Sequence, residues 1–344
     1  MYLNYFGLRR APFGLTPDPE FIYFTPAHRN VAAGLLHSVV SQKGLCVLTG
    51  DAGTGKTSLV RLLVSSLPQN LVQVSLVLNP SLSPLELLQE ILRDFGIQSE
   101  NFTKAQCLAR FNQLLLSLHA EGKAALLIVD DAQCLNAEGL DELRLLMKLE
   151  TDKEKLVQII LTGQDELTGI LDEHRMRPLK QLVASRHELF PLTVREVDAY
   201  IQYRWQKCGD TKPPFTPEAV ELIASASGGI PRLINVICDN SLLTAFASDQ
   251  REVAERQVEE SLRDLHIKYT PRPAAETRLA PQAAMNGPAA ARNGSANGAS
   301  NGTATAAVTE EVKEEDCPLP TLSRYLKPLW RFRLSGLGKD AEER

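Results

Sequence analysis

Short apolar runs alternate along the chain with longer segments of helical period, beginning near Gly44. A continuous apolar run is typical of a strand buried on both faces, as in a parallel sheet, and the intervening segments are long enough for crossover helices. The strands predicted in this way cover residues 44–50, 72–78, 125–130 and 157–163, with a weaker fifth at 187–192. This pattern predicts an α/β domain built on a parallel sheet flanked by helices.

Helix boundaries follow from capping residues and from apolar spacing. Ser83-Pro84-Leu85-Glu86 predicts a helix start, because serine caps the helix, proline suits its first position and glutamate completes a capping box. Another helix is expected to begin near Thr103. After Leu192 the strand pattern ends, and helices are predicted over 193–196, 215–227, 230–247 and 252–267. A small all-α domain is therefore expected after the sheet.

The composition changes at Thr270, where Pro, Ala, Asn and Gly become frequent. Such a segment buries too little apolar surface to offset its ordering entropy, so residues 270–318 are expected to form a disordered linker. Residues 319–344 are a basic and aromatic tail, either a docking peptide for a membrane surface or partner protein, or an inert end. The expected domains before them are an α/β domain including the N-terminal segment (1–192) and a helical domain (193–269).

Composition and charge limit the classes of partner and the cellular compartment that fit this sequence. The chain has 344 residues, of which 44% are hydrophobic, and its net charge of −5 argues against nucleic acid as a partner. The six cysteines form no C-x-x-C pair and are expected to be core residues. The start lacks the apolar stretch of a signal peptide, and no segment is long and apolar enough to span a membrane. We therefore expect a cytoplasmic protein, peripheral at the inner face of the membrane if the tail binds there.

The segment GDAGTGKT (50–57) is the most specific chemical signal. It matches G-x-x-x-x-G-K-[ST] between a predicted strand and a predicted helix, the arrangement of a phosphate-binding loop, or P-loop. Its glycines let backbone N–H groups point at phosphate oxygens, Lys56 reaches the outer phosphates, and the Thr57 hydroxyl binds Mg²⁺. We therefore predict a site for ATP and Mg²⁺ formed by Gly50, Asp51, Ala52, Gly53, Thr54, Gly55, Lys56, Thr57 and Ser58.

Two adjacent carboxylates end the predicted strand of LLIVDDAQ (126–133). Burying an unpaired acid is costly, so a cation or several donors must face them. Asp130 fits the second protein anchor of the Mg²⁺ ion that Thr57 binds. Asp131 is either a base that positions the attacking water or a surface acid without a role.

These motifs, with LRLLMKLETDKEKLVQIILTGQDEL (143–167) and SGGIPRLINVICDNSLL (227–243), resemble the ExeA-type AAA+ ATPases over about residues 1–265. The resemblance includes the N-terminal segment. It implies a P-loop AAA+ module with the strand order of that class, a helical lid, and ATP hydrolysis that drives assembly or remodelling of envelope machinery. A homo-oligomer and a partner from an envelope or secretion system are therefore expected.

The resemblance also implies roles for single residues. Gln164, or alternatively Thr162, stands where the family has the polar sensor that touches the γ-phosphate and the water. Arg232, in GGIPR, is similar to the lid arginine that reports the nucleotide state to the helical domain. The catalytic set implied in this way is Asp131, Gln164 and Arg232.

Two departures from the family pattern bear on catalysis. The family generally has Glu where this chain has Asp131, and the shorter side chain withdraws the carboxylate by about 1.5 Å. A general base misplaced by that distance can lose about 10²-fold in rate. Relatives tend to have Gln-Arg where this chain has Gln181-Leu182, which removes an arginine that would act in trans. The arginines that could substitute are Arg175, Arg177 and Arg186.

Three functions fit the sequence. The first is an oligomeric Mg²⁺-dependent ATPase, slowed by Asp131, that drives an envelope, secretion or exopolysaccharide-export system. The second is a nucleotide-gated binding module with little hydrolysis. The third is a regulatory ATPase of the DNA-transposition type, which requires a basic face that the net charge does not favour.

Overall fold

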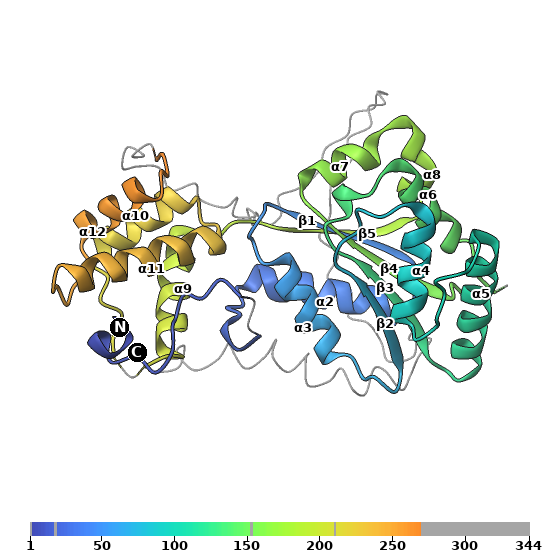
Figure 1. Ribbon diagram of the computed structural model, residues 1–344, viewed down its shortest axis with the longest axis horizontal. Helices are drawn as coiled ribbons and strands as arrows, with labels where there is room; N and C mark the ends of the chain where they lie inside the picture. The colour runs from blue at the N-terminus through green and yellow to red at the C-terminus, as the bar shows by residue number, and fades with distance from the viewer. Residues whose placement is uncertain (1, 17–18, 152–153, 210, 270–344) are drawn as a thin grey trace, which may run out of the picture.

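A five-stranded parallel sheet forms the centre of the larger domain (Figure 1). The computed structural model describes residues 2–16, 19–151, 154–209 and 211–269. The strand order is β2-β3-β4-β1-β5, and each pairing is parallel. The predicted α/β class is therefore confirmed. The strands are β1 (Leu45–Gly50), β2 (Val72–Val77), β3 (Ala124–Val129), β4 (Val157–Thr162) and β5 (Val183–Leu189).

The fifth strand differs from its predicted position. We expected it at 187–192, whereas β5 covers Val183–Leu189. β5 lies at the edge of the sheet, and its residues before Leu189 alternate between half-buried and exposed. Because this edge strand lacks the continuous apolar run of a central strand, the apolar residues that follow it displaced the prediction toward the helical domain.

Helices cover both faces of the sheet. One face packs against α2 and α3 through a cluster that includes Leu126 and Ile128. The other face packs against helices α4 to α8 through a cluster that includes Leu127 and Leu161. Successive residues of β3 enter opposite clusters, as the two-residue period of a strand requires. The helices are α2 (Pro26–Val40), α3 (Lys56–Ser66), α4 (Pro84–Asp94), α5 (Lys104–Ala120), α6 (Ala137–Leu146), α7 (Asp165–Asp172) and α8 (Arg177–Lys180).

The helix starts that capping chemistry defined are confirmed. The Ser83 hydroxyl accepts from the Glu86 N–H, and the Glu86 carboxylate accepts from the Ser83 N–H, so α4 begins with a complete capping box. Thr103 and Gln106 form the same arrangement at the start of α5. These reciprocal bonds satisfy backbone N–H groups that have no partner within the helix.

The helical domain follows β5 and contains α9 (Val194–Gln206), α10 (Pro217–Ser227), α11 (Pro231–Ala247) and α12 (Glu255–Asp264). The predicted segments overlap all of these helices, although α9 continues well beyond 193–196. Among the residues described, no helix is long and apolar enough to cross a membrane. The expected linker (270–318) and tail (319–344) lie outside the described residues. The remaining helices within the described residues are α1 (Tyr2–Phe6), η1 (Pro19–Phe21), η2 (Ala132–Cys134) and η3 (His174–Met176).

The N-terminal segment packs in the helical domain. Phe13 belongs to the same buried cluster as Trp205, and Figure 1 shows the N-terminus beside α9. Arg204 is buried as well, and its Nε donates to the Pro12 carbonyl at 2.6 Å. The boundary drawn from sequence placed this segment with the α/β domain, because it precedes the first strand. Its aromatic side chains instead complete the core of the helical domain.

Phe13→Ala should destabilise the helical domain by about 3 to 5 kcal/mol, because the side chain is 1% exposed and its removal leaves a cavity. Urea unfolding followed by Trp205 fluorescence measures this free energy, in a Trp330→Phe background that removes the other of the two tryptophans. Leu15→Ala, at a side chain that is 58% exposed, should change it by less than about 0.5 kcal/mol. Equal effects of the two substitutions would contradict the packing of the N-terminal segment.

Candidate functional site

The residues with predicted chemical roles gather at the carboxyl ends of neighbouring strands. Val129 of β3 pairs with Leu161 of β4, so Asp130 comes to lie beside Thr162. Thr162 in turn is opposite Leu48 of β1, the strand that leads into the loop 51–55. Because parallel strands end at the same edge of a sheet, the loop and the two carboxylates meet there.

The loop after β1 has the backbone conformation of a P-loop. Gly53 and Gly55 have φ values of 85° and 105°, which residues with side chains rarely adopt. Thr54 is buried, and its hydroxyl donates to the Asp51 carbonyl at 2.8 Å. Gly55 is the N-cap of α3, and a Cβ built on it would meet nothing within 4 Å. Open space in front of a helix N-terminus suits an anion.

Lys56 begins α3, with its ammonium turned back over the loop. The residue is 6% exposed, and Nζ donates to the carbonyl oxygens of Gly50 (2.7 Å) and Asp51 (2.9 Å). Burial lowers the pKa of the Lys56 ammonium, and the negative charges of Asp131, Asp130 and Asp51 oppose this shift. The ammonium is therefore held over the loop, where it can bind phosphate oxygens.

The remaining residues of the predicted nucleotide site differ in exposure. Asp51 and Ala52 are exposed, whereas Gly53, Thr57 and Ser58 are half-buried. Thr57 and Ser58 lie in the first turn of α3, directly after Lys56. The structure therefore brings the whole predicted set together at the end of β1, in the loop that follows it and in the first turn of α3.

Asp130 is 3% exposed, and donors from different elements surround its carboxylate. Thr57 Oγ1 donates to Oδ2 at 2.6 Å, the Thr162 hydroxyl donates to Oδ1, and the Asp131 N–H donates to Oδ1 at 3.1 Å. These bonds offset the cost of burying the charge. The hydroxyl of Thr57 and the carboxylate of Asp130 are oxygen ligands of the kind that Mg²⁺ prefers, so the residues present fit this ion.

Asp131 is half-buried and has a left-handed backbone conformation, with φ 50° and ψ 40°. Aspartate adopts this region more readily than most residues. Its Oδ1 accepts a hydrogen bond from Gln133 Nε2 at 3.1 Å. Its charge also acts on the Lys56 ammonium and favours the protonated form of that group.

The two candidates for the polar sensor occupy different places. Thr162 is fully buried, and its hydroxyl is bonded to Asp130. Gln164 is the N-cap residue of α7, and its backbone N–H donates to Gln133 Oε1 at 3.2 Å. The Gln164 side chain is half-buried and makes no capping bond. Thr162 is therefore held at the Asp130 carboxylate, whereas the Gln164 side chain is not tied to α7.

The helical domain contacts the P-loop through the start of α11. The Arg232 N–H donates to the Gly53 carbonyl at 3.3 Å. A Cβ on Gly53 would lie 2.8 Å from Arg232 Cβ and 3.1 Å from Ile230 Cγ2, so the absence of a side chain permits this approach. The Arg232 side chain itself is exposed. The residue predicted as the lid arginine thus lies against the P-loop.

The arginines considered for a role in trans are all exposed: Arg175, Arg177 and Arg186. Arg175 forms an ion pair with Glu173 at 2.7 Å. Leu182, at the position where relatives have arginine, packs against the apolar cluster on the α4–α8 face of the sheet. A residue that acts at the nucleotide site of a neighbouring chain must be exposed on its own chain.

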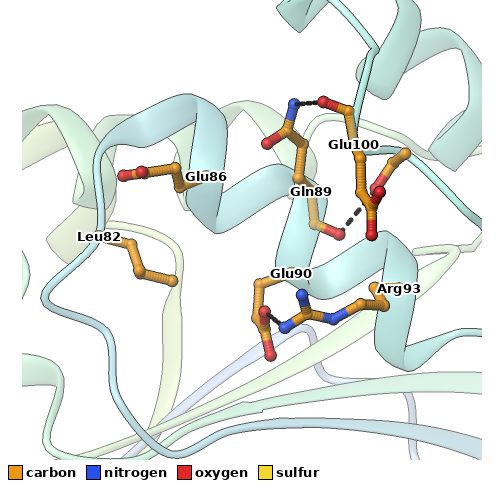
Figure 2. Close-up of a pocket in the computed structure, with 7 residues that line it drawn as sticks. Leu82, Glu86, Gln89, Glu90, Arg93 and Glu100 are labelled. Carbon is orange, nitrogen blue, oxygen red and sulfur yellow. Dashed lines mark hydrogen bonds and ion pairs between the residues drawn. The ribbon is translucent and has the colours of Figure 1, made fainter.

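A separate hollow of about 300 Å³ lies beside α4 (Figure 2). It is lined by Leu82, Glu86, Gln89, Glu90, Arg93, Ser99 and Glu100. Figure 2 shows the polar groups bonded within the protein: Glu90 pairs with Arg93, and Gln89 Nε2 donates to the Glu100 carbonyl at 3.3 Å. Because these groups already have partners, we assign the hollow no ligand.

Two residues without a predicted role contact the site. Gln133 joins Asp131 to the start of α7. His28 of α2 is buried beside the Thr54 backbone, with Nδ1 at 2.7 Å from the Thr25 hydroxyl, and burial lowers its pKa. Gln133 follows the acid pair closely in the sequence, so this proximity was a usable signal. His28 and the P-loop are separated by a whole strand, and no local pattern connects them.

Parts of this chain match a known domain family and a known protein. The AAA domain family matches residues 36–171. General secretion pathway protein A of Aeromonas hydrophila is 38% identical over 260 residues, which cover 75% of this chain and 47% of that protein. The chain thus spans about half the length of this relative.

Similar solved structures include ORC2 of Aeropyrum pernix in its ADPNP-ADP complexes, with a TM-score of 0.56 and 19% identity over 75% of this chain and 73% of that chain. CDC6p of Pyrobaculum aerophilum has a TM-score of 0.57 and 17% identity over 74% of this chain and 70% of that chain. At such identities the likeness shows the fold alone. With the identity to general secretion pathway protein A and the AAA domain match, the chain belongs to the ExeA-type AAA+ ATPase family.

Proposed function

We propose that this protein binds and hydrolyses ATP with Mg²⁺, and that the cycle drives assembly or remodelling of an envelope, secretion or exopolysaccharide-export system. The observation that carries the proposal is the 2.6 Å contact between Thr57 Oγ1 and Asp130 Oδ2, beside the ammonium of Lys56. A hydroxyl, a carboxylate and an ammonium at one helix N-terminus form a donor set for a magnesium-bound nucleotide.

Each residue of the site has a distinct task in this proposal. The backbone N–H groups of the loop and Lys56 bind phosphate oxygens. Thr57 and Asp130 hold Mg²⁺, which when bound neutralises charge that develops on the phosphates. Asp131 accepts a proton from water as the water oxygen bonds to the terminal phosphorus and the bond to the ADP oxygen breaks. Gln164 orients that water.

Arg232 connects this chemistry to the helical domain. The Arg232 N–H is bonded to the Gly53 carbonyl, so the exposed side chain of Arg232 extends from backbone that contacts the P-loop. A phosphate that attracts the guanidinium would therefore change the position of α11 relative to the P-loop. This supports the role of a lid arginine that reports nucleotide state.

The cellular role rests on the name of the relative, general secretion pathway protein A. In this proposal the chain acts on the cytoplasmic side as a homo-oligomer, with an envelope or secretion-system protein as its partner. One of the exposed arginines considered above would reach the site of a neighbouring chain. The basic tail (319–344) would bind the partner or an anionic membrane surface.

A nucleotide-gated binding module is the second candidate, and Asp131 favours it. The Asp131 carboxylate reaches about 1.5 Å less far than that of Glu, so it would be poorly placed to take a proton from the attacking water. ATP occupancy, and not hydrolysis, would then set the state of the helical domain. Steady-state phosphate release separates the two candidates, because the second requires ATP binding with little turnover.

Lys56→Ala should abolish stabilisation by ATP, because the loop then has no cation for the outer phosphates. ATP with Mg²⁺ at about 100 times its Kd should stabilise the wild-type chain by roughly 2.7 kcal/mol, measured by urea unfolding. Lys148→Ala, at an exposed lysine of the same domain, should retain this gain. Equal stabilisation of the Lys56 variant and the wild type would contradict the assignment of the P-loop.

Asp131→Glu should raise kcat with little change in ATP affinity, because the longer side chain restores the reach of the family residue. Asp131→Ala should lower kcat about 10²-fold while ATP and Mg²⁺ still bind. Steady-state phosphate release and ATP-induced stabilisation, measured on the same preparations, test both statements. A slower Glu variant together with an unaffected Ala variant would show that Asp131 is not the base.

Thr162→Val and Gln164→Ala should differ in their effects. Thr162→Val removes a hydroxyl donor from the buried Asp130 carboxylate. The Mg²⁺ concentration that ATP binding requires should therefore rise about tenfold. Gln164→Ala should lower kcat and leave this Mg²⁺ requirement unchanged. Titration of Mg²⁺ at fixed ATP, with ATP-induced stabilisation and phosphate release as readouts, distinguishes them. The opposite pattern would exchange the two roles.

A further inference from the structure

The side-chain amide of Gln133 connects the ends of two neighbouring strands. Gln133 lies in η2, which follows β3 and the acid pair. Its Nε2 donates to Asp131 Oδ1 at 3.1 Å, and its Oε1 accepts from the Gln164 N–H at 3.2 Å. Gln164 comes directly before α7, just beyond β4. One amide thus joins the carboxylate proposed as the base to the residue proposed as the sensor.

These two hydrogen bonds fix the orientation of the amide. A carboxylate only accepts and a backbone N–H only donates, so Nε2 faces Asp131 and Oε1 faces Gln164. A carboxylate or an alkyl group of the same length would satisfy one of these partners or neither. Gly163 leaves the necessary space, because a Cβ built there would lie 2.8 Å from Gln133 Oε1. The site therefore accommodates this amide closely.

The backbone and the side chain of Asp131 are held by different groups. Its N–H is bonded to Asp130 Oδ1, and its left-handed conformation leads into η2, so the backbone is fixed. The carboxylate can still turn about two side-chain bonds. The hydrogen bond from Gln133 restricts that rotation and keeps Oδ1 at the end of β3. The direction of the base thus depends on an amide two residues away.

We propose that Gln133 is a positioning residue, which aims the Asp131 carboxylate at the phosphate end of the P-loop and makes that aim depend on the turn between β4 and α7. This inference rests on the proposed ATPase function, in which Asp131 is the base. A short carboxylate depends strongly on such support, since a misplacement of about 1 Å can cost about 10²-fold in rate.

The bond to Gln164 gives the arrangement a regulatory consequence. When the Gln164 side chain engages a terminal phosphate, any shift of its backbone is passed through Gln133 Oε1 to the amide and so to Asp131. The base is aligned when the β4–α7 turn is in its phosphate-bound position. Hydrolysis is thereby made conditional on a complete nucleotide, by a route separate from the Thr162–Asp130 contact.

Gln133→Leu and Gln133→Glu test the proposal in the full chain with ATP and Mg²⁺. Leu removes both bonds, whereas Glu keeps an acceptor for the Gln164 N–H but places a second negative charge against Asp131. Both variants should lower kcat about 10- to 100-fold, with KM for ATP and the ATP-induced shift in Tm unchanged. Gln98→Leu, at an exposed glutamine, should retain the wild-type kcat.

A double substitution separates positioning from a general structural effect. In an Asp131→Ala background, Gln133→Leu should cause no further loss of kcat, because the group that it positions is absent. A further loss in that background, or wild-type kcat in the single Gln133→Leu variant, would overturn the proposal. If Asp131→Ala retains wild-type kcat, the proposed base is wrong and the inference falls with it. A slow Asp131→Ala with a normal Gln133→Leu would remove only the positioning role.

Discussion

The rest of the site depends on the buried carboxylate of Asp130. A charge with so little exposure persists only where donors surround it, and those donors come from α3, from the end of β4 and from the next residue in the chain. A single group therefore fixes Thr57, Thr162 and the Asp131 backbone relative to one another. These bonds join the ends of β3 and β4 and connect α3 to the sheet.

The P-loop is also a junction between the domains. Because Gly53 has no side chain, the start of α11 packs on the loop backbone, and the Leu192 N–H is bonded to the Gly229 carbonyl nearby at 2.8 Å. Phosphate binding alone would not require this contact between the loop and the start of α11. Because the P-loop contacts the helical domain, a change in the conformation of the loop alters the contacts of that domain.

Features defined by residues close together in the chain could be predicted from the sequence. The P-loop, the acid pair and the capping box of Ser83 with Glu86 are local patterns, and their chemistry does not depend on distant segments. The edge strand β5 was misplaced because alternating exposure leaves no apolar run. The packing of Phe13 in the helical domain and the approach of Arg232 to Gly53 join segments far apart in the chain. No local pattern encodes those contacts.

The packing of the N-terminal segment means that the chain passes between the domains twice. The first passage lies between Tyr23, which packs on the helical core, and Phe24, which packs on the α/β core. The second lies between Leu189 and Leu192, which belong to the same two cores. A body tethered at one point can swing and twist, whereas one tethered at two points chiefly bends about the line between them. These two covalent connections therefore restrict the ways in which the helical domain can turn relative to the P-loop.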